Sequence, residues 1–131
     1  MNYKAFTLAA VGACAIALPT YGHHSFAMFD NSKMSHVTGT VKEFEYINPH
    51  SWLHVTVPDA GGKVVTWSFE MGSVAQLVRD GWNRESVKVG DSMTVDFHPL
   101  RDGSNGGQFR TLTFAGGKKL CQGGAGESIC K

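Results

Sequence analysis

The sequence has almost no net charge and few charged side chains. Twelve basic residues stand against 11 acidic ones, and only 18% of the 131 residues are charged. Non-specific binding to nucleic acid needs a basic excess, so this composition argues against that class and predicts no nucleic-acid partner. The length excludes a multidomain enzyme, and a hydrophobic content of 42% predicts one small globular domain instead of a disordered tail.

The sequence also lacks the motifs of common hydrolases and nucleotide-binding enzymes. It contains no Gly-x-Ser-x-Gly elbow, Walker loop, dinucleotide fingerprint or His-Glu-x-x-His pair. We therefore expect a protein without enzymatic activity. The enzymatic alternative is a copper oxidase built on a histidine brace.

Only one long apolar run is present, and it lies at the N-terminus. Residues 5–18 carry no charge and follow Lys4, which is the pattern of a secretory signal peptide. The small side chains of Thr20 and Gly22 predict cleavage after Gly22. The run is shorter than the roughly 20 apolar residues that cross a bilayer. We expect a periplasmic or secreted protein with no stable membrane insertion; an uncleaved anchor and lipoprotein processing at Cys14 are the alternatives.

The predicted cleavage leaves a mature chain with two cysteines, Cys121 and Cys130, on either side of a glycine-rich segment. Two thiols in an exported protein are expected to be oxidised, so we predict a disulfide between them, with a pair of metal thiolates as the alternative. The predicted parts of the chain are a signal peptide (1–22), a histidine-containing arm (23–36), a barrel domain (37–120) and a disulfide-closed tail (121–131).

The barrel domain shows five short runs with the alternation of β-strands, interrupted once by a helix. The first strand, residues 37–47, changes its inward phase midway, which indicates a bulge or bend. Ser73 and Gln76 form a capping box that starts a helix over residues 73–80, between the third and fourth strands. This order of elements is that of the OB fold, so we predict a small five-stranded OB-like β-barrel, with an open β-sandwich as the alternative.

Four segments form a specific motif set: His-His-Ser-Phe-Ala-Met-Phe-Asp at 23–30, Asn-Pro-His-Ser-Trp at 48–52, Gly-Trp at 81–82 and His-Pro-Leu-Arg-Asp-Gly at 98–103. Together they resemble a family of small exported bacterial proteins that is catalogued as domain of unknown function 6152. The resemblance implies export and covers most of the mature chain, with the tail after Leu120 outside it. It implies no activity.

The histidines are the strongest candidates for a ligand site. After cleavage, His23 offers a free amine and an imidazole, and a second imidazole completes a three-nitrogen set suited to copper. If Gly22 were the first residue instead, His24 would complete a square-planar nitrogen site for Cu(II) or Ni(II). We predict a copper ion held by His23 and His24, with His50 or His98 completing the set; solvated histidines without metal are the alternative.

Two predicted loops flank the usual ligand face of an OB fold. His50 lies in the loop between the first and second strands, and His98, Arg101 and Asp102 lie between the fourth and fifth. If these loops converge, Asp102 can orient an imidazole and Arg101 can clamp an anion; otherwise both loops are structural turns. Trp52, on the outward side of the second strand, either packs or offers a stacking platform.

The predicted function is therefore a periplasmic, non-enzymatic protein that binds a transition metal, with copper favoured. The alternative is a metal-free module in which Trp52, Arg101 and Asp102 hold a saccharide, an anionic solute or another exported protein. His54 and Glu70 lie on the outward faces of neighbouring strands, where we expect them to pair across the ladder or to join the site.

Overall fold

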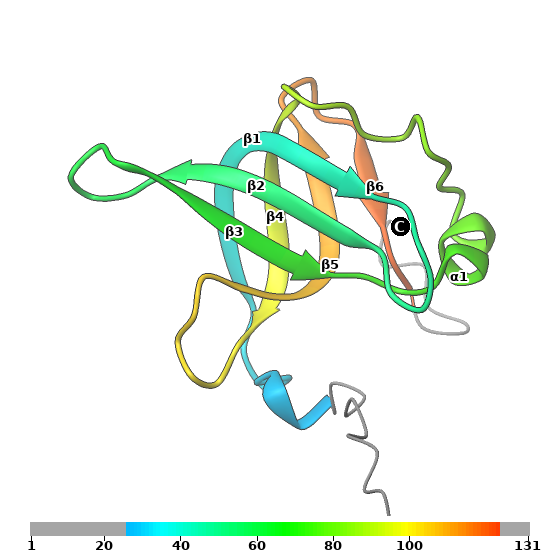
Figure 1. Ribbon diagram of the computed structural model, residues 1–131, viewed down its shortest axis with the longest axis horizontal. Coiled ribbons are helices and arrows are strands. Elements are labelled where there is room, and N and C mark those ends of the chain that lie inside the picture. The colour runs from blue at the N-terminus through cyan, green and yellow to red at the C-terminus, as the bar shows by residue number, and fades with distance from the viewer. Residues whose placement is uncertain (1–25, 124–131) are drawn as a thin grey trace, which may run out of the picture.

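The structure is a computed structural model that describes residues 26–123 (Figure 1). The predicted signal peptide, His23, His24 and Cys130 lie outside this range. Within it, no helix is long and apolar enough to cross a membrane.

The described chain forms a closed β-barrel. Its elements are η1 (Phe26–Met28), β1 (Ser35–Glu45), β2 (Trp52–Pro58), β3 (Val64–Glu70), α1 (Val74–Arg79), β4 (Ser92–Pro99), β5 (Gly106–Phe114) and β6 (Lys119–Cys121). The strands follow the order β3-β2-β1-β4-β5-β6, and β3 also pairs with β5. That last pairing is parallel and closes β1 to β5 into a barrel, while β6 pairs with the second half of β5. The predicted five-stranded OB-like barrel with one short helix after the third strand is confirmed; β6 was not predicted.

The long strand β1 pairs on both of its edges. Residues 35–40 pair with β4 and residues 40–45 pair with β2, and the register against β2 shifts between Val41 and Glu43. Val41 is buried before the shift and Tyr46 after it. Because the shift changes the phase of the strand, apolar side chains from both halves face the interior, and the predicted bulge is confirmed.

Apolar side chains from all five barrel strands fill the interior. Those with no exposed surface or almost none are Val41, Leu53, Val55, Phe69, Met93, Val95, Phe97, Phe109 and Leu112. The rings of Phe69 and Phe97 lie 4.9 Å apart at the centre. Each such burial stabilises the fold by about 1.5–3 kcal/mol, which makes the barrel wall a rigid support for the side chains on its outer surface.

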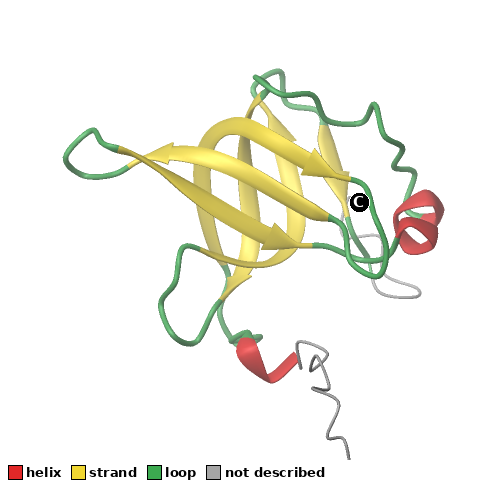
Figure 2. Cartoon of the chain, viewed as in Figure 1, coloured by secondary structure: helices red, strands yellow, loops and turns green. Residues whose placement is uncertain are grey.

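The helix α1 lies outside the barrel beside the loop between β1 and β2 (Figure 2). Ser73 caps it by accepting a hydrogen bond from the amide of Gln76 at 3.3 Å, as predicted. The side chain of Gln76 does not complete the capping box but donates to the carbonyl of Gly123 at 3.5 Å. Next along the chain, the buried indole of Trp82 donates to the carbonyl of Cys121 at 2.8 Å, which ties this segment to β6.

The bend in β1 needs a glycine. A Cβ atom at Gly39 would overlap the carbonyl oxygen of Thr56, whereas a Cβ atom at Gly116 would meet nothing within 4 Å. We expect Gly39→Ala to lower the free energy of unfolding by about 2 kcal/mol, as overpacking does in other proteins. The matched substitution Gly116→Ala should change it by less than about 0.5 kcal/mol. Urea denaturation measures both, and equal effects would contradict this account of β1.

Candidate functional site

The outer surface of β1, β2 and β3 holds polar side chains in two neighbouring rows. In one row, Glu43 on β1 lies opposite His54 on β2, which lies opposite Ser68 on β3. Residues directly opposite in antiparallel strands place their side chains on the same face. In the next row, two residues along each strand, Glu45 on β1 lies opposite Trp52 on β2, which lies opposite Glu70 on β3. We call the combined surface the outer face; its members are Glu43, Glu45, Trp52, His54, Ser68 and Glu70.

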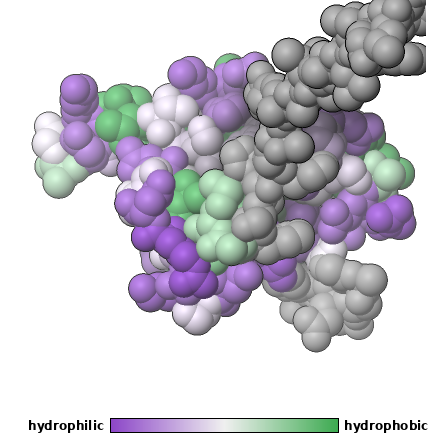
Figure 3. All heavy atoms as spheres, turned by 60° about the horizontal axis from the view of Figure 1, so that its bottom comes forward, coloured by the Kyte–Doolittle hydropathy of each residue, from purple (hydrophilic) through white to green (hydrophobic). Residues whose placement is uncertain are grey.

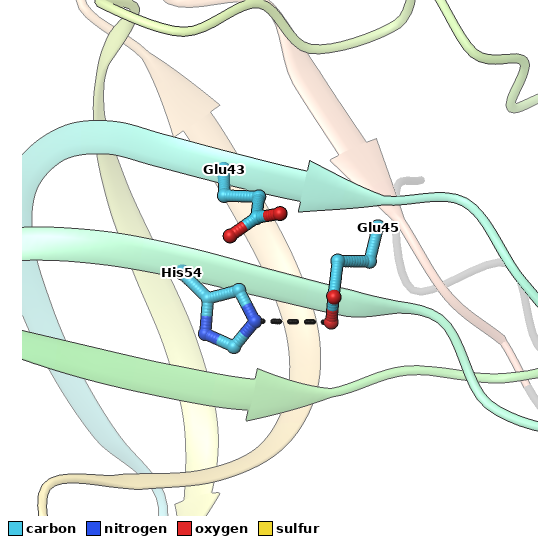
Figure 4. Close-up of side chains that lie close together, drawn as sticks. All are labelled: Glu43, Glu45 and His54. Carbon is cyan, nitrogen blue, oxygen red and sulfur yellow. Dashed lines mark hydrogen bonds and ion pairs between the residues drawn. The ribbon is translucent and has the colours of Figure 1, made fainter.

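Two glutamates of the outer face approach one histidine (Figure 4). Nε2 of His54 lies 3.2 Å from Oε2 of Glu45, and the ligand atoms of Glu43, Glu45 and His54 all lie within 4.8 Å of one another. Within residues 26–123, no other group of three or more His, Cys, Asp or Glu side chains comes together in this way. Ligands bound at 2.0–2.2 Å in a tetrahedral site lie about 3.4 Å apart, so the glutamates need to shift by only about 1 Å to hold an ion.

Ser68 and Trp52 hold the ring of His54 in place. Nδ1 of His54 lies 2.8 Å from the hydroxyl of Ser68, and the indole of Trp52 stacks on the imidazole at an interplanar angle of 5°. Because a carboxylate only accepts, Nε2 donates to Glu45, and Nδ1 of the neutral ring accepts from Ser68. If an ion took the place of the Nε2 proton, the same hydroxyl would accept from Nδ1 instead. Ser68 can therefore hydrogen-bond to His54 both when the ring is free of metal and when an ion is bound at Nε2.

A second histidine–glutamate pair lies at the end of β3. The side chain of Glu70 is 9% exposed, and its Oε1 lies 3.4 Å from Nδ1 of His50. The same nitrogen lies 3.2 Å from the carbonyl of Met71. Both neighbours are acceptors, so Nδ1 carries a proton. Oε2 of Glu70 has no hydrogen-bond partner among the described residues.

The expected pairing of His54 with Glu70 is not what the structure shows. His54 contacts Glu45 and Ser68, and Glu70 contacts His50. The reason is the register: the residue opposite His54 on β3 is Ser68, while Glu70 lies opposite Trp52.

His98 was expected in the loop between the fourth and fifth strands, but it lies within β4, where it pairs with Gln108, while Arg101 follows the strand. Both residues contact the N-terminal arm. Nδ1 of His98 donates to the carbonyl of Lys33 at 2.7 Å, and Nε of Arg101 donates to the carbonyl of Ala27 at 3.0 Å. No hydrogen bond or group of potential metal ligands in the described part of the chain joins His98 to His50. These contacts fix the arm against the barrel at residues 27–33.

These features define a small OB-like barrel with a polar group of potential metal ligands, Glu43, Glu45 and His54, on its outer face. The chain belongs to the family of unknown function DUF6152, whose model matches residues 10–110. The match covers β1 to β4 and therefore the whole outer face, and it confirms the resemblance found in the sequence. No curated protein and no solved structure matches the chain.

Sequence reasoning missed Glu43 and Glu45. The phase of β1 after its bulge, with Phe44 and Tyr46 inward, was a signal that both glutamates face outward. Their approach to His54 depends on the register of β1 against β2, which no local pattern gives.

Asp102 is part of a tight turn. Its Oδ1 accepts from the amide of Ser104 at 2.9 Å and from the hydroxyl of Ser104 at 2.7 Å. The hydroxyl first, and then the amide, lower the pKa of Asp102 from its ordinary value of 3.8. These hydrogen bonds therefore stabilise the folded protein fully above about pH 3.8, and the stabilisation is lost as the pH falls through the lowered pKa of Asp102.

We expect Ser104→Ala to raise the pKa of Asp102 towards 3.8, because the first of these hydrogen bonds is removed. An NMR titration of the carboxyl carbons measures the change. Asp30, whose pKa is lowered by Ser32, serves as an internal control and should not move. An unchanged pKa of Asp102 would show that the hydroxyl does not stabilise the turn.

Proposed function

We propose that this protein is an exported, non-enzymatic binding protein that holds a divalent transition-metal ion at Glu43, Glu45 and His54. The approach of their ligand atoms to within 4.8 Å is the observation that supports the proposal most strongly. One imidazole and two carboxylates form a borderline donor set, for which Cu²⁺ and Zn²⁺ stand at the top of the divalent series. Ca²⁺, which takes six to eight oxygen ligands, suits this set poorly.

The charges around the site favour a cation. Glu43 and Glu45 are next-but-one neighbours on one face of β1, and like charges so close destabilise the strand surface. The nearby Lys42 does not neutralise them through an ion pair in the described structure, since its Nζ lies 3.4 Å from the hydroxyl of Thr66. A bound cation removes the repulsion between the two carboxylates.

The place of the site in the fold also supports a binding role. The surface over strands 2 and 3 is where OB folds hold their ligands. His54 lies on β2 and its partner Ser68 on β3. The imidazole is further supported on one side by the half-buried Trp52, so the ligating ring is oriented before an ion arrives.

Copper bound by His23 and His24 is the second candidate of the same class. Two contacts favour it: Arg101 holds Ala27, four positions after His23, and His98 is fixed against Lys33 of the same arm. His98 or His50 would supply the further nitrogen.

The metal-free alternative has less support. Arg101 and Asp102, its predicted polar contacts, already bond to the arm and to their own turn. On the uncovered part of the face in Figure 3, hydrophilic side chains predominate and apolar side chains form small patches. The exposed large apolar side chains are on separate elements and loops: Met28, Met34, Ile47, Val64, Val78 and Val89.

The disulfide stays a prediction. Cys121 ends β6 and is 9% exposed, and its backbone is fixed by Trp82, so a bridge to Cys130 would join the tail to the barrel. Intact mass spectrometry of the exported protein should give a chain that starts at His23 and is two hydrogens lighter than its reduced form. A mass that reduction does not change would contradict the bridge.

Metal titration of single variants tests the proposed function. We expect His54→Ala and Glu45→Gln to weaken Zn²⁺ binding by more than about tenfold, since loss of even an outer partner of a ligand costs 10–100-fold. Ser68→Ala should cost about tenfold for that reason. His36→Ala is the matched control, because His36 is an exposed histidine of β1 outside the site. Isothermal titration calorimetry measures each affinity.

Unchanged Zn²⁺ and Cu²⁺ binding in His54→Ala would contradict the site on the outer face. If His23→Ala abolished Cu²⁺ binding in the same series, the metal would belong to the N-terminal histidines instead. Displacement of Zn²⁺ by millimolar Ca²⁺ would contradict the transition-metal class of the site.

A further inference from the structure

A separate cavity of about 490 Å³ lies on another part of the barrel wall. It is lined by Met34, Asp96, His98, Arg110, Thr111 and Lys119. These residues come from the arm and from β4, β5 and β6, and none of them belongs to the outer face. The volume is within the range of roughly 300–1,000 Å³ that small-molecule sites occupy.

Arg110 enters this cavity through an irregularity in β5. Asp96 pairs with Thr111 and Phe97 pairs with Phe109, so Arg110 stands between two partners in a register shift. A bulge of this kind turns a side chain away from the regular alternation. Nε of Arg110 is buried and has no hydrogen-bond partner among the described residues. A buried N–H donor without an acceptor is costly, so a small shift of the Arg110 side chain that brought Nε into contact with a ligand acceptor would remove this cost.

The cavity carries a net positive charge, because two cations, Arg110 and Lys119, stand against the single carboxylate of Asp96. The carboxylate of Asp96 accepts from the hydroxyl of Thr111 at 2.6 Å, and no ion pair within residues 26–123 joins it to Arg110. Lys119 adds a second cation from the exposed first residue of β6. His98 is fixed by Lys33 through Nδ1, which leaves Nε2 for a ligand.

We infer that this cavity binds a small solute with an oxyanion group, either phosphate or carboxylate. The planar guanidinium of Arg110 can donate two parallel hydrogen bonds to either group. The flexible ammonium of Lys119 adds positive charge and can contact either group without a fixed geometry. His98 and Met34 also line the cavity, so it offers an imidazole to a polar group of the solute and a thioether to an apolar one. The inference is independent of the metal site proposed at Glu43, Glu45 and His54, because that site and the cavity share no residue.

Titration of the isotope-labelled mature protein with inorganic phosphate, and separately with succinate, tests the inference by NMR. We expect a saturable shift of the Nε–H signal of Arg110 with at least one of the two anions. Lys119→Ala should weaken that binding by about fivefold or more, as loss of a charged contact does. Lys118→Ala is the matched control: it removes the same charge from the neighbouring exposed position outside the cavity, and it should leave the affinity unchanged within about twofold.

Arg110→Met should abolish the binding, with thermal unfolding as the check that the barrel is intact. Binding of phosphate alone identifies a phosphate-bearing solute, and binding of succinate alone identifies a carboxylate.

The absence of a saturable shift with either anion up to about 10 mM would overturn the inference, because a dissociation constant above this concentration is too weak for specific recognition of a small solute. Equal weakening by Lys118→Ala and Lys119→Ala would overturn it too, because the effect would then be general charge attraction. Retained anion binding in His54→Ala separates this result from the metal site.

Discussion

One strand, β1, serves both sides of the barrel, and the rest of the structure depends on how it bends. Its first half pairs with β4 and its second half pairs with β2. A straight strand with unbroken alternation could not make both pairings and still direct its apolar side chains into the barrel. Gly39 permits the close approach to Thr56, and the register shift after Val41 resets the phase. The same shift turns Glu43 and Glu45 outward. The fold and the proposed metal site therefore share one cause.

Closure of the barrel depends on a second close approach, between β3 and β5. A Cβ atom at Gly106 would overlap the carbonyl of Ser68 on β3, and one at Gly107 would overlap the carbonyl of His98 on β4, so these glycines let β5 approach both of its neighbours. The parallel pairing that these glycines permit fixes Ser68, the residue that supports His54. It also places Glu70 beside Gln108 on β5, in keeping with the burial of this carboxylate. The outer face is thus held from both edges.

Local patterns were sufficient to predict the elements of this fold. Alternation along the strands, the change of phase in β1 and the cap at Ser73 are properties of neighbouring residues, and the structure confirms each. The three-residue strand β6 has too few positions to show alternation, and it is recognised only by its pairing with Thr111–Thr113. The sequence could predict the fold because its distinctive order of strands and helix follows from these local signals.

The side-chain partners were harder to predict, because they depend on register and on bulges. His54 was recognised as outward-facing, but its glutamates come from another strand. Arg101 was the expected anion-binding cation, yet its guanidinium holds the arm, and Arg110, the candidate that the structure offers, lies at the bulge in β5. In both cases the residue types were visible in the sequence and the contacts were not.

The central claim is that Glu43, Glu45 and His54 hold a divalent transition-metal ion on the outer face. A crystal of the mature protein soaked in Zn²⁺ and measured on both sides of the zinc absorption edge tests it most directly. The account predicts an anomalous peak within bonding distance of Nε2 of His54 and of a carboxylate oxygen from each glutamate. A peak at other side chains, with these three left unliganded, would contradict it.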